Sequence, residues 1–181
     1  MKILGIDPGT GICGFGVVEI TKTNRPLARD FGVISTPAHT PLPDRLADIY
    51  DSMHEIIKLN QPDLISIEKL FFSKNITTGI SVAEARGICL LVAKQHDLPI
   101  YEYTPNEIKK TLTGYGSAGK KQMQEMVRIQ LGLEDVPRPD DAADALAAAI
   151  TQLFSSRADL LAPSSHRLNW YSHTFVNSIL A

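Results

Sequence analysis

The stretch from Lys2 to Thr10 constrains the fold of this chain more than any other. It is apolar and carries branched side chains from Ile3 to Ile6, and it stops at a single carboxylate, Asp7, which turn residues follow. This pattern is typical of a buried strand. Because an unpaired charge is costly to bury, we expect Asp7 at the strand's end, in a cleft, facing a cation or a hydrogen-bonding ligand.

The chain has 181 residues, of which 44% are hydrophobic, enough for one domain with an ordinary core. Its two cysteines, Cys13 and Cys89, lie in apolar segments and are expected to be buried thiols rather than a disulfide. We therefore expect a cytoplasmic protein. We expect no signal peptide and no membrane span, because no apolar run reaches the ~18–20 residues that a span needs. No Cys/His cluster has the spacing of zinc ligands.

The formal net charge of -2 does not suggest nucleic-acid binding, but the charges are unevenly distributed. Residues 69–128 hold nine basic and five acidic residues, so this segment carries +4 and the remainder -6. A basic middle in an acidic chain permits an anion-binding face. Solvated helix surfaces are the alternative interpretation.

The hydrophobic pattern predicts an α/β fold. Three strands with short connections come first and favour antiparallel hairpins; helices and two further strands then alternate. The result is a mixed five-stranded sheet with helices on both faces. A single domain is expected over residues 1–155, and residues 156–181 are interpreted as a C-terminal tail. The predicted strands are 2–7, 14–20, 29–35, 64–68 and 98–103, and the predicted helices are 43–59, 77–95, 105–112, 120–131 and 140–154.

Carboxylates recur where predicted strands end and where the last helix begins. Asp7 and Glu68 each end a strand, and ligands gather at the carboxyl ends of strands in open sheets. Asp141 and Asp144 are three residues apart and share a helix face. Asp140 before them is a natural N-cap. The alanines of this helix would let it approach the sheet closely.

Four carboxylates in one place would repel each other strongly without a cation. Oxygen ligands suit Mg²⁺ or Mn²⁺, and two such ions support in-line phosphoryl transfer. Taken singly, each carboxylate can be explained as a helix cap or a turn residue. Together, Asp7, Glu68, Asp141 and Asp144 favour a site for two divalent cations.

The first turn also permits a different function. The sequence Asp7-Pro8-Gly9-Thr10-Gly11 resembles the phosphate loop of the actin, Hsp70 and sugar-kinase ATPases. Those proteins close two large domains on a nucleotide, and 181 residues cannot supply both. Length therefore argues against the ATPase interpretation.

An ordered set of short motifs is similar to those of a known family, the RuvC Holliday junction resolvases. The likeness covers about residues 1–155, and each motif alone is weak whereas the ordered set is specific. It implies an RNase H-like fold and a homodimer that nicks two opposed strands of a four-way DNA junction in recombination and repair, with RuvA–RuvB as partners. The motifs are Ile3-Leu4-Gly5-Ile6-Asp7-Pro8-Gly9, Ile67-Glu68-Lys69-Leu70-Phe71, Ser73-Lys74-Asn75, Ala85-Arg86-Gly87, Gly116-Ser117-Ala118 with Lys120, and Asp141-Ala142-Ala143-Asp144-Ala145-Leu146-Ala147.

The resemblance also implies roles for single residues. The family's catalytic carboxylates fall on Asp7, Glu68, Asp141 and Asp144, with Asp140 as an ambiguous neighbour of Asp141. Its junction-contacting aromatic falls on Phe71, with Phe72 as the alternative. Its important basic residues fall on Lys109 and Lys120, with Lys110 and Lys121 as alternatives.

The residues themselves are compatible with these roles. Phe71, followed by Lys74, could stack on unpaired bases or wedge between them, and core packing is the alternative. Lys109 and Lys120 flank a Gly-rich loop and could hold phosphates near the cations, with Lys120 neutralising charge that develops on the scissile phosphate. Solvated helix faces are the alternative.

Small residues four apart in the helix 77–95, namely Gly79, Ala83 and Gly87, indicate close packing. Packing on the chain's own sheet and a two-fold dimer contact both remain possible, and the family favours the dimer. We thus expect a metal-dependent, structure-selective endonuclease. A non-catalytic junction-binding module of the same fold is one alternative. A different RNase H-like nuclease with the same site, acting on RNA–DNA hybrids or on other branched DNA, is the other.

Overall fold

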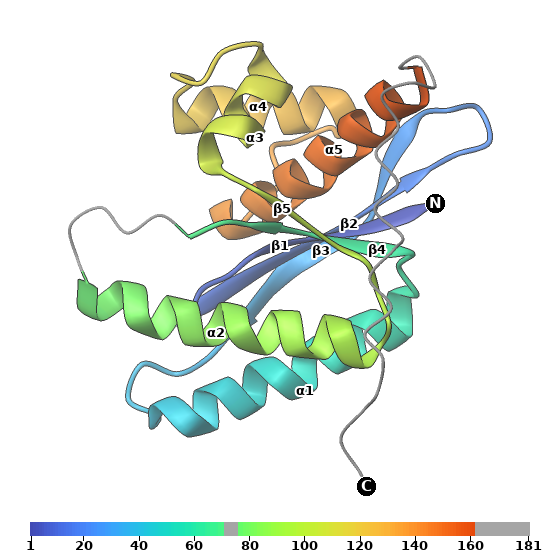
Figure 1. Cartoon of the computed structure of the whole chain (residues 1–181). Coiled ribbons are helices and arrows are strands. Elements are labelled where there is room, and N and C mark those ends of the chain that lie inside the picture. Colours follow the sequence, from blue (N-terminus) through green and yellow to red (C-terminus); the bar gives the residue numbers. More distant parts are fainter. Residues whose placement is uncertain (71–75, 162–181) are drawn as a thin grey trace, which may run out of the picture.

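The computed structural model describes residues 1–70 and 76–161. Its centre is a five-stranded sheet with the order β3-β2-β1-β4-β5 (Figure 1). The pairs β1–β2 and β2–β3 are antiparallel, whereas β1–β4 and β4–β5 are parallel, which confirms the predicted mixed sheet. The strands are β1 (Lys2–Asp7), β2 (Ile12–Ile20), β3 (Pro26–Ser35), β4 (Leu64–Glu68) and β5 (Ile100–Tyr103).

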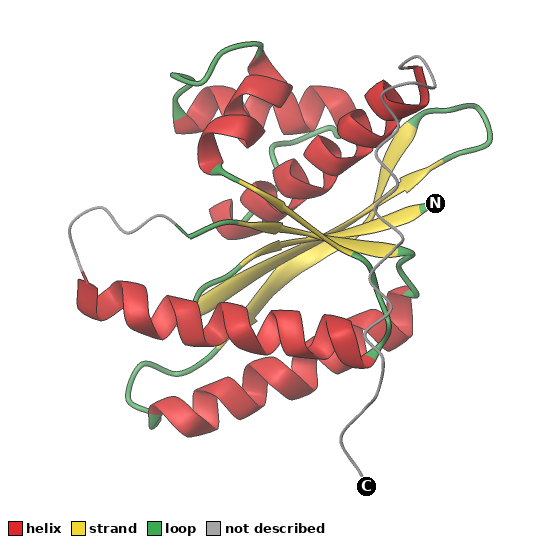
Figure 2. Ribbon diagram, in the orientation of Figure 1, coloured by secondary structure: helices red, strands yellow, loops and turns green. Residues whose placement is uncertain are grey.

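Helices cover both faces of the sheet, as predicted (Figure 2). One layer is formed by α1 (Leu42–Asn60) and α2 (Ile76–Gln95). The other is formed by α3 (Pro105–Thr113), α4 (Lys120–Leu131) and α5 (Asp140–Leu161). Each layer encloses its own hydrophobic cluster against the sheet, so the molecule has two cores with the strands between them.

The element boundaries differ from the prediction mainly at α5. The helix continues to Leu161, beyond the predicted end at residue 154. Its serines do not interrupt it, because they bond within the helix: the Ser155 hydroxyl donates to the Thr151 carbonyl at 3.0 Å and the Gln152 amide to the Ser156 hydroxyl at 2.8 Å. Residues 162–181 of the predicted tail lie outside the described residues.

Side chains alternate between the two faces along β1, and this decides where Asp7 lies. Ile3 belongs to the core under α5, whereas Leu4 and Ile6 belong to the core against α1 and α2. With a period of two, Gly5 and Asp7 share the face of Ile3. The same parity places Glu68 on that face of β4, where the Ser66 hydroxyl donates to the Ala148 carbonyl of α5 at 2.7 Å. Both strand-end carboxylates thus face α5.

Three glycines let α5 lie directly on the strands. Gly5 is paired with Gly16 across β1 and β2, and Asp7 with Gly14. A Cβ atom on Gly5 would lie 1.9 Å from the Ala145 carbonyl oxygen, and one on Gly14 would lie 2.1 Å from the Asp141 carbonyl oxygen. No larger residue fits there, so these glycines set the distance between the sheet and the helix that carries Asp141.

Two further expectations can be compared with the described residues. Cys13 and Cys89 are buried free thiols, as predicted. Over residues 1–70 and 76–161, no helix has the length and apolar character needed to cross a bilayer.

Candidate active site

The two strand-end carboxylates lie on neighbouring strands. β1 and β4 run parallel with Ile6 opposite Ile67, so Asp7 and Glu68, the next residues along, end their strands at one edge of the sheet. The register thus brings together the two strand-end carboxylates that were predicted from the sequence to share one cation site. The carboxyl-end edge is where open α/β sheets gather their ligands.

The start of α5 brings two more carboxylates to this edge. Asp141 and Asp144 lie in the first turns of the helix and are half-buried, and the Asp141 backbone rests on Gly14, the partner of Asp7 in the sheet. All four predicted carboxylates therefore meet where β1, β4 and α5 converge.

The electrostatics of the site show charge that the protein does not fully compensate. Burial, reinforced by Glu68, Asp144 and Asp141, raises the pKa of Asp7 to about 8. Burial and Asp144 raise the pKa of Glu68 to about 7, although Lys109 opposes the shift. The pKa of Asp144 is also raised, chiefly by burial. Each shift reports a carboxylate whose negative charge is disfavoured by desolvation and by its neighbours.

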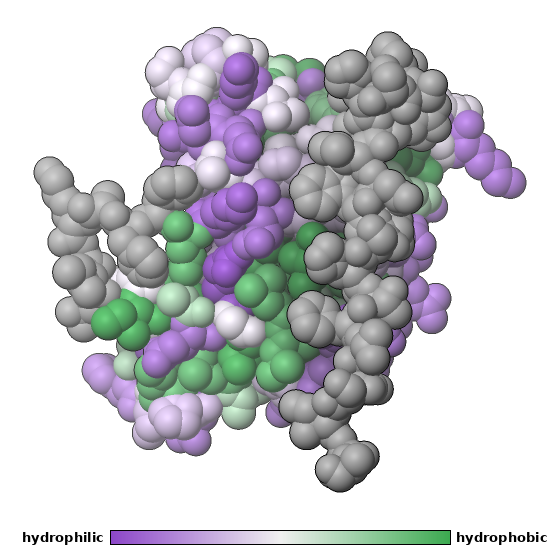
Figure 3. All heavy atoms as spheres, in the orientation of Figure 1, coloured by the Kyte–Doolittle hydropathy of each residue, from purple (hydrophilic) through white to green (hydrophobic). Residues whose placement is uncertain are grey.

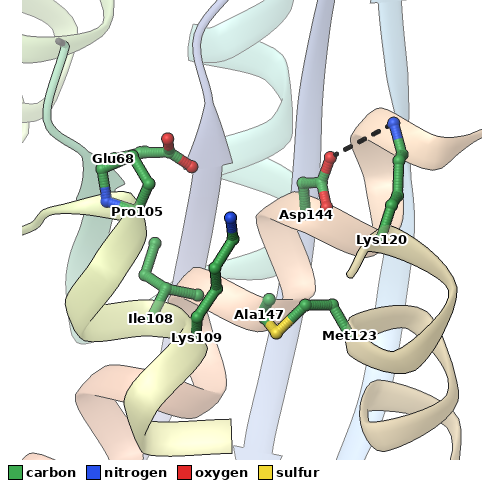
Figure 4. Close-up of a pocket in the computed structure, with 8 residues that line it drawn as sticks. All are labelled: Glu68, Pro105, Ile108, Lys109, Lys120, Met123, Asp144 and Ala147. Atoms are coloured by element: carbon green, nitrogen blue, oxygen red, sulfur yellow. Dashed lines mark ion pairs between the residues drawn. The ribbon is translucent and has the colours of Figure 1, made fainter. Parts of the chain in front are cut away.

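Two of the predicted lysines line the same cavity as two of the carboxylates, Glu68 and Asp144. Glu68 and Asp144 face each other across it, Lys109 points between them from α3, and Lys120 stands at the start of α4 (Figure 4). The remaining lining residues are Pro105, Ile108, Met123 and Ala147. Lys109 lowers the pKa values of both Glu68 and Asp144, so its ammonium partly offsets their charge.

Asp140 and Asp141 have different surroundings, which bears on the ambiguity between them. The Lys120 ammonium lies 3.0 Å from the Asp140 carboxylate and 3.8 Å from that of Asp144. The Gln124 amide also donates to Asp140 at 2.8 Å. These hydrogen bonds lower the pKa of the exposed Asp140, whereas Asp141 raises the pKa of the half-buried Asp7. Asp140 therefore holds Lys120 at the rim, and Asp141 belongs to the carboxylate group.

Sequence reasoning missed Arg86, which lies in a quoted motif but was given no role. From α2, the Arg86 guanidinium donates to the Glu68 backbone carbonyl at 3.3 Å and pairs with Glu102 on β5. It thereby ties the ends of β4 and β5 to the helix beneath them. The only available signal was an arginine within a largely apolar helix, which does not identify a partner.

The residues at this edge fit divalent cations. Within residues 1–70 and 76–161, no three Asp, Glu, His or Cys side chains lie close enough together, as they stand, to hold one metal ion. The donors are nonetheless carboxylate oxygens, which suit Mg²⁺ or Mn²⁺. Their raised pKa values show that ionising these clustered, half-buried carboxylates is unfavourable, and a bound cation would offset that cost.

The structure does not describe the segment after β4 that is expected to contact DNA. Phe71, its alternative Phe72, and Lys74 lie outside the described residues. Lys110 and Lys121, the alternatives to Lys109 and Lys120, are exposed.

A family model and the sequences of known proteins both match this chain over most of its length. The family model of crossover junction endodeoxyribonuclease RuvC matches residues 3–152. The enzyme of that name from Desulfitobacterium hafniense is 52% identical over 155 residues, covering 86% of this chain and 93% of the relative. That from Thermomicrobium roseum is 48% identical over 158 residues, covering 87% and 96%.

Solved structures of RuvC proteins also match this chain. Thermus thermophilus RuvC matches with a TM-score of 0.80 and 33% identity, covering 87% of this chain and 96% of that one. T. thermophilus RuvC in complex with a Holliday junction substrate matches with a TM-score of 0.79 and 31% identity, with the same coverage. The yeast mitochondrial Holliday junction resolvase Ydc2, at 13% identity and a TM-score of 0.62, shares the fold. This resolvase-type, RNase H-like fold, the matched family model and the close relatives show that the chain belongs to the RuvC family of crossover junction endodeoxyribonucleases.

Proposed function

We propose that this chain resolves four-way DNA junctions with Mg²⁺ or Mn²⁺ ions, two per subunit, held by Asp7, Glu68, Asp141 and Asp144. The observation that carries the proposal is the convergence of these carboxylates at one sheet edge with uncompensated charge, seen in the raised pKa of Asp7, to about 8, and of Glu68, to about 7. When bound, such ions supply charge neutralisation for in-line displacement at a phosphodiester.

Three basic side chains near the carboxylates would bind the phosphate or hold the site in place. Lys109 reaches into the cavity between Glu68 and Asp144, where its ammonium can position a phosphate (Figure 4). Lys120, at the rim, can shift from Asp140 to a scissile phosphate and neutralise developing charge there. Arg86 keeps the Glu68 backbone in place while these groups act.

The substrate proposal draws on a relative, since T. thermophilus RuvC has been solved with a Holliday junction substrate. The test compares one preparation on three substrates: a synthetic four-way junction, the matching linear duplex and an RNA–DNA hybrid. We expect cleavage of the junction that requires Mg²⁺, and little cleavage of the other two. Equal cleavage of the hybrid, or junction cleavage in EDTA, would contradict the proposal.

A homodimer would present two such sites to a symmetric junction. The outward face of α2 supports this proposal: Ile80 is 54% exposed and Leu91 49%, and a Cβ atom on Gly87 would meet nothing within 4 Å. Hydrophobic side chains gather over this helix on the face shown in Figure 3. Gly87 is thus open to a partner rather than packed on its own sheet.

Further parts of the proposal rest on the resemblance. Phe71 and Lys74 follow β4 directly along the chain, and we place them among the DNA-binding residues. RuvA–RuvB is the proposed partner in recombination and repair. A cytoplasmic location agrees with the two buried free thiols. The proposed nuclease domain spans residues 1–155.

A further inference from the structure

A pair of histidines lies at the edge of the sheet opposite the carboxylates. His54 is in the C-terminal half of α1, and His96 directly follows the end of α2. The chain passes from α1 into the beginning of β4 and from α2 towards the beginning of β5, whereas Asp7 and Glu68 end their strands (Figure 1). The histidine pair is therefore separate from the candidate active site.

The two imidazoles are held in one arrangement by hydrogen bonds. His54 Nδ1 lies 2.7 Å from His96 Nε2, and His54 Nε2 lies 3.2 Å from the Gln95 side-chain oxygen. An amide oxygen can only accept, so His54 Nε2 carries a proton. In the neutral ring Nδ1 then has a free lone pair, and His96 Nε2–H donates to it. The Tyr50 hydroxyl donates to the same Gln95 oxygen at 3.1 Å.

We propose that His54 Nδ1 and His96 Nε2 form a two-histidine site for a borderline transition-metal cation of the Zn²⁺ class. The cation would take the place of the proton now shared between the two nitrogens. His96 would change tautomer: its Nε2 loses that proton to solvent while its Nδ1 takes one up from solvent, so the ring stays neutral and both nitrogens donate their lone pairs to the metal. Water would fill the other coordination positions, since both rings are half-exposed.

The geometry needs little change for this. Two nitrogens bound to one Zn²⁺ at ~2.0–2.1 Å stand roughly 3.0–3.4 Å apart, a few tenths of an ångström more than the present 2.7 Å. Histidine ligands commonly donate their other N–H to an oxygen that fixes the ring, as His54 does to Gln95. Imidazole nitrogen suits Zn²⁺, Ni²⁺ and Cu²⁺, whereas Mg²⁺ prefers the carboxylates at the other edge.

The surroundings of the histidine pair have opposing effects on cation binding. Burial, then His54 and Lys58, lower the pKa of His96, so its neutral form, the one that binds metals, dominates at neutral pH. The Lys58 ammonium, on α1 one turn after His54, would repel a bound cation. The site should therefore bind moderately, and Lys58→Gln should tighten it.

The test is a calorimetric titration of the untagged, EDTA-treated full chain with ZnCl₂ in excess Mg²⁺, which occupies the carboxylates. We expect one Zn²⁺ site per chain that weakens at least about tenfold in His54→Gln and in His96→Gln. His39→Gln, which removes an exposed histidine elsewhere, is the matched control and should change nothing. Junction cleavage in Mg²⁺ should be unchanged in all three variants.

Histidine-ring NMR of the native chain gives a second measurement that needs no variant. Equimolar Zn²⁺ should move the ring signals of His54 and His96 and leave that of His39 in place. The proposal is overturned if the double variant His54→Gln/His96→Gln binds Zn²⁺ as the native chain does, or if Zn²⁺ leaves these two signals unmoved.

Discussion

Asp7 and Asp140 show how differently two aspartates behave within one site. Asp7 is half-buried among carboxylates, and its pKa rises to about 8. Asp140 is 57% exposed and pairs with Lys120, and its pKa falls. The first residue therefore destabilises the folded chain when it ionises, whereas the second does not. Variants at these two positions should respond to pH and to cations in different ways.

Asp7→Asn should stabilise the metal-free protein at neutral and alkaline pH. Because the folded-state pKa of Asp7, about 8, lies above its unfolded value of 3.8, folding favours the protonated form. Its contribution to stability is complete below pH ~4 and is lost as the pH rises towards 8. We expect the variant to gain about 1–3 kcal/mol of unfolding free energy over the native chain at pH 8, and little at pH 4. Urea unfolding in EDTA at both pH values measures this, and a variant less stable than the native chain at pH 8 would contradict it.

Asp140→Asn should raise the Mg²⁺ requirement through Lys120. Without Asp140, the ammonium has Asp144 as its nearby carboxylate and competes there with the cation. We expect the Mg²⁺ concentration for half-maximal cleavage to rise about threefold, a modest effect suited to an exposed pair, with the maximal rate retained.

The double variant Asp140→Asn/Lys120→Gln separates this explanation from direct metal binding by Asp140. Compared with Lys120→Gln alone, it should show no further rise in the Mg²⁺ requirement. An equal rise in both backgrounds would instead make Asp140 a metal ligand.

At the scale of elements, the close contact of α5 with β1 and β2 holds the site together. Gly5, Gly14 and Gly16 form the surface on which the helix lies, and Asp141 is part of the first helical turn there. A side chain at any of these three glycine positions would push the helix off the sheet and move Asp141 and Asp144 away from Asp7. The packing of α5 and the proposed catalytic geometry thus depend on the same backbone contact.

Gly5→Ala tests this contact. Its Cβ atom would lie 1.9 Å from the Ala145 carbonyl oxygen and 2.9 Å from the Ala149 nitrogen, both backbone atoms that cannot rotate away. We expect a loss of about 3 kcal/mol in urea unfolding and a fall in cleavage rate. Gly32→Ala on β3 is the matched control, because its Cβ atom would meet only the Phe15 ring at 3.1 Å; a loss within about 1 kcal/mol is expected. Similar losses in both variants would argue against a special role for Gly5.

Much of the arrangement of strands and helices around the site can be predicted from local sequence patterns. The short apolar runs at 2–7 and 64–68 predict two buried strands that end in carboxylates, and the three-residue spacing of Asp141 and Asp144 places them on one helix face. The close approach of helix and sheet was anticipated from the alanines, but the facing glycines were not. Which face of a strand a distant helix crosses is decided by the assembled fold. The contact of Arg86 with the Glu68 carbonyl was missed for the same reason. It joins residues 18 positions apart, and its acceptor is a backbone oxygen, which every residue carries and no sequence pattern marks.

At the scale of the whole molecule, a four-way junction requires two cuts and each chain supplies one site. Ile80→Glu should therefore convert the proposed dimer to a monomer, because it places a charge on the exposed apolar face of α2. Ile129→Glu on α4 is the matched control, since both side chains are 54% exposed and Ile129 lies on the opposite layer. Analytical ultracentrifugation should show a monomer for the first variant alone.

The same variants should differ in their products on a cruciform plasmid. A dimer that makes paired nicks gives linear DNA, whereas a monomer gives nicked circles. Linear product from a demonstrated Ile80→Glu monomer would contradict the requirement for a dimer.

The carboxylates at the ends of β1 and β4 are central to the proposed activity, and single-turnover cleavage of a four-way junction tests them most directly. Asp7→Asn and Glu68→Gln should bind the junction within about threefold of the native affinity and cleave it on the order of 10³-fold more slowly in saturating Mg²⁺. Cleavage by either variant at the native rate, with binding intact, would contradict the assignment of this edge as the active site.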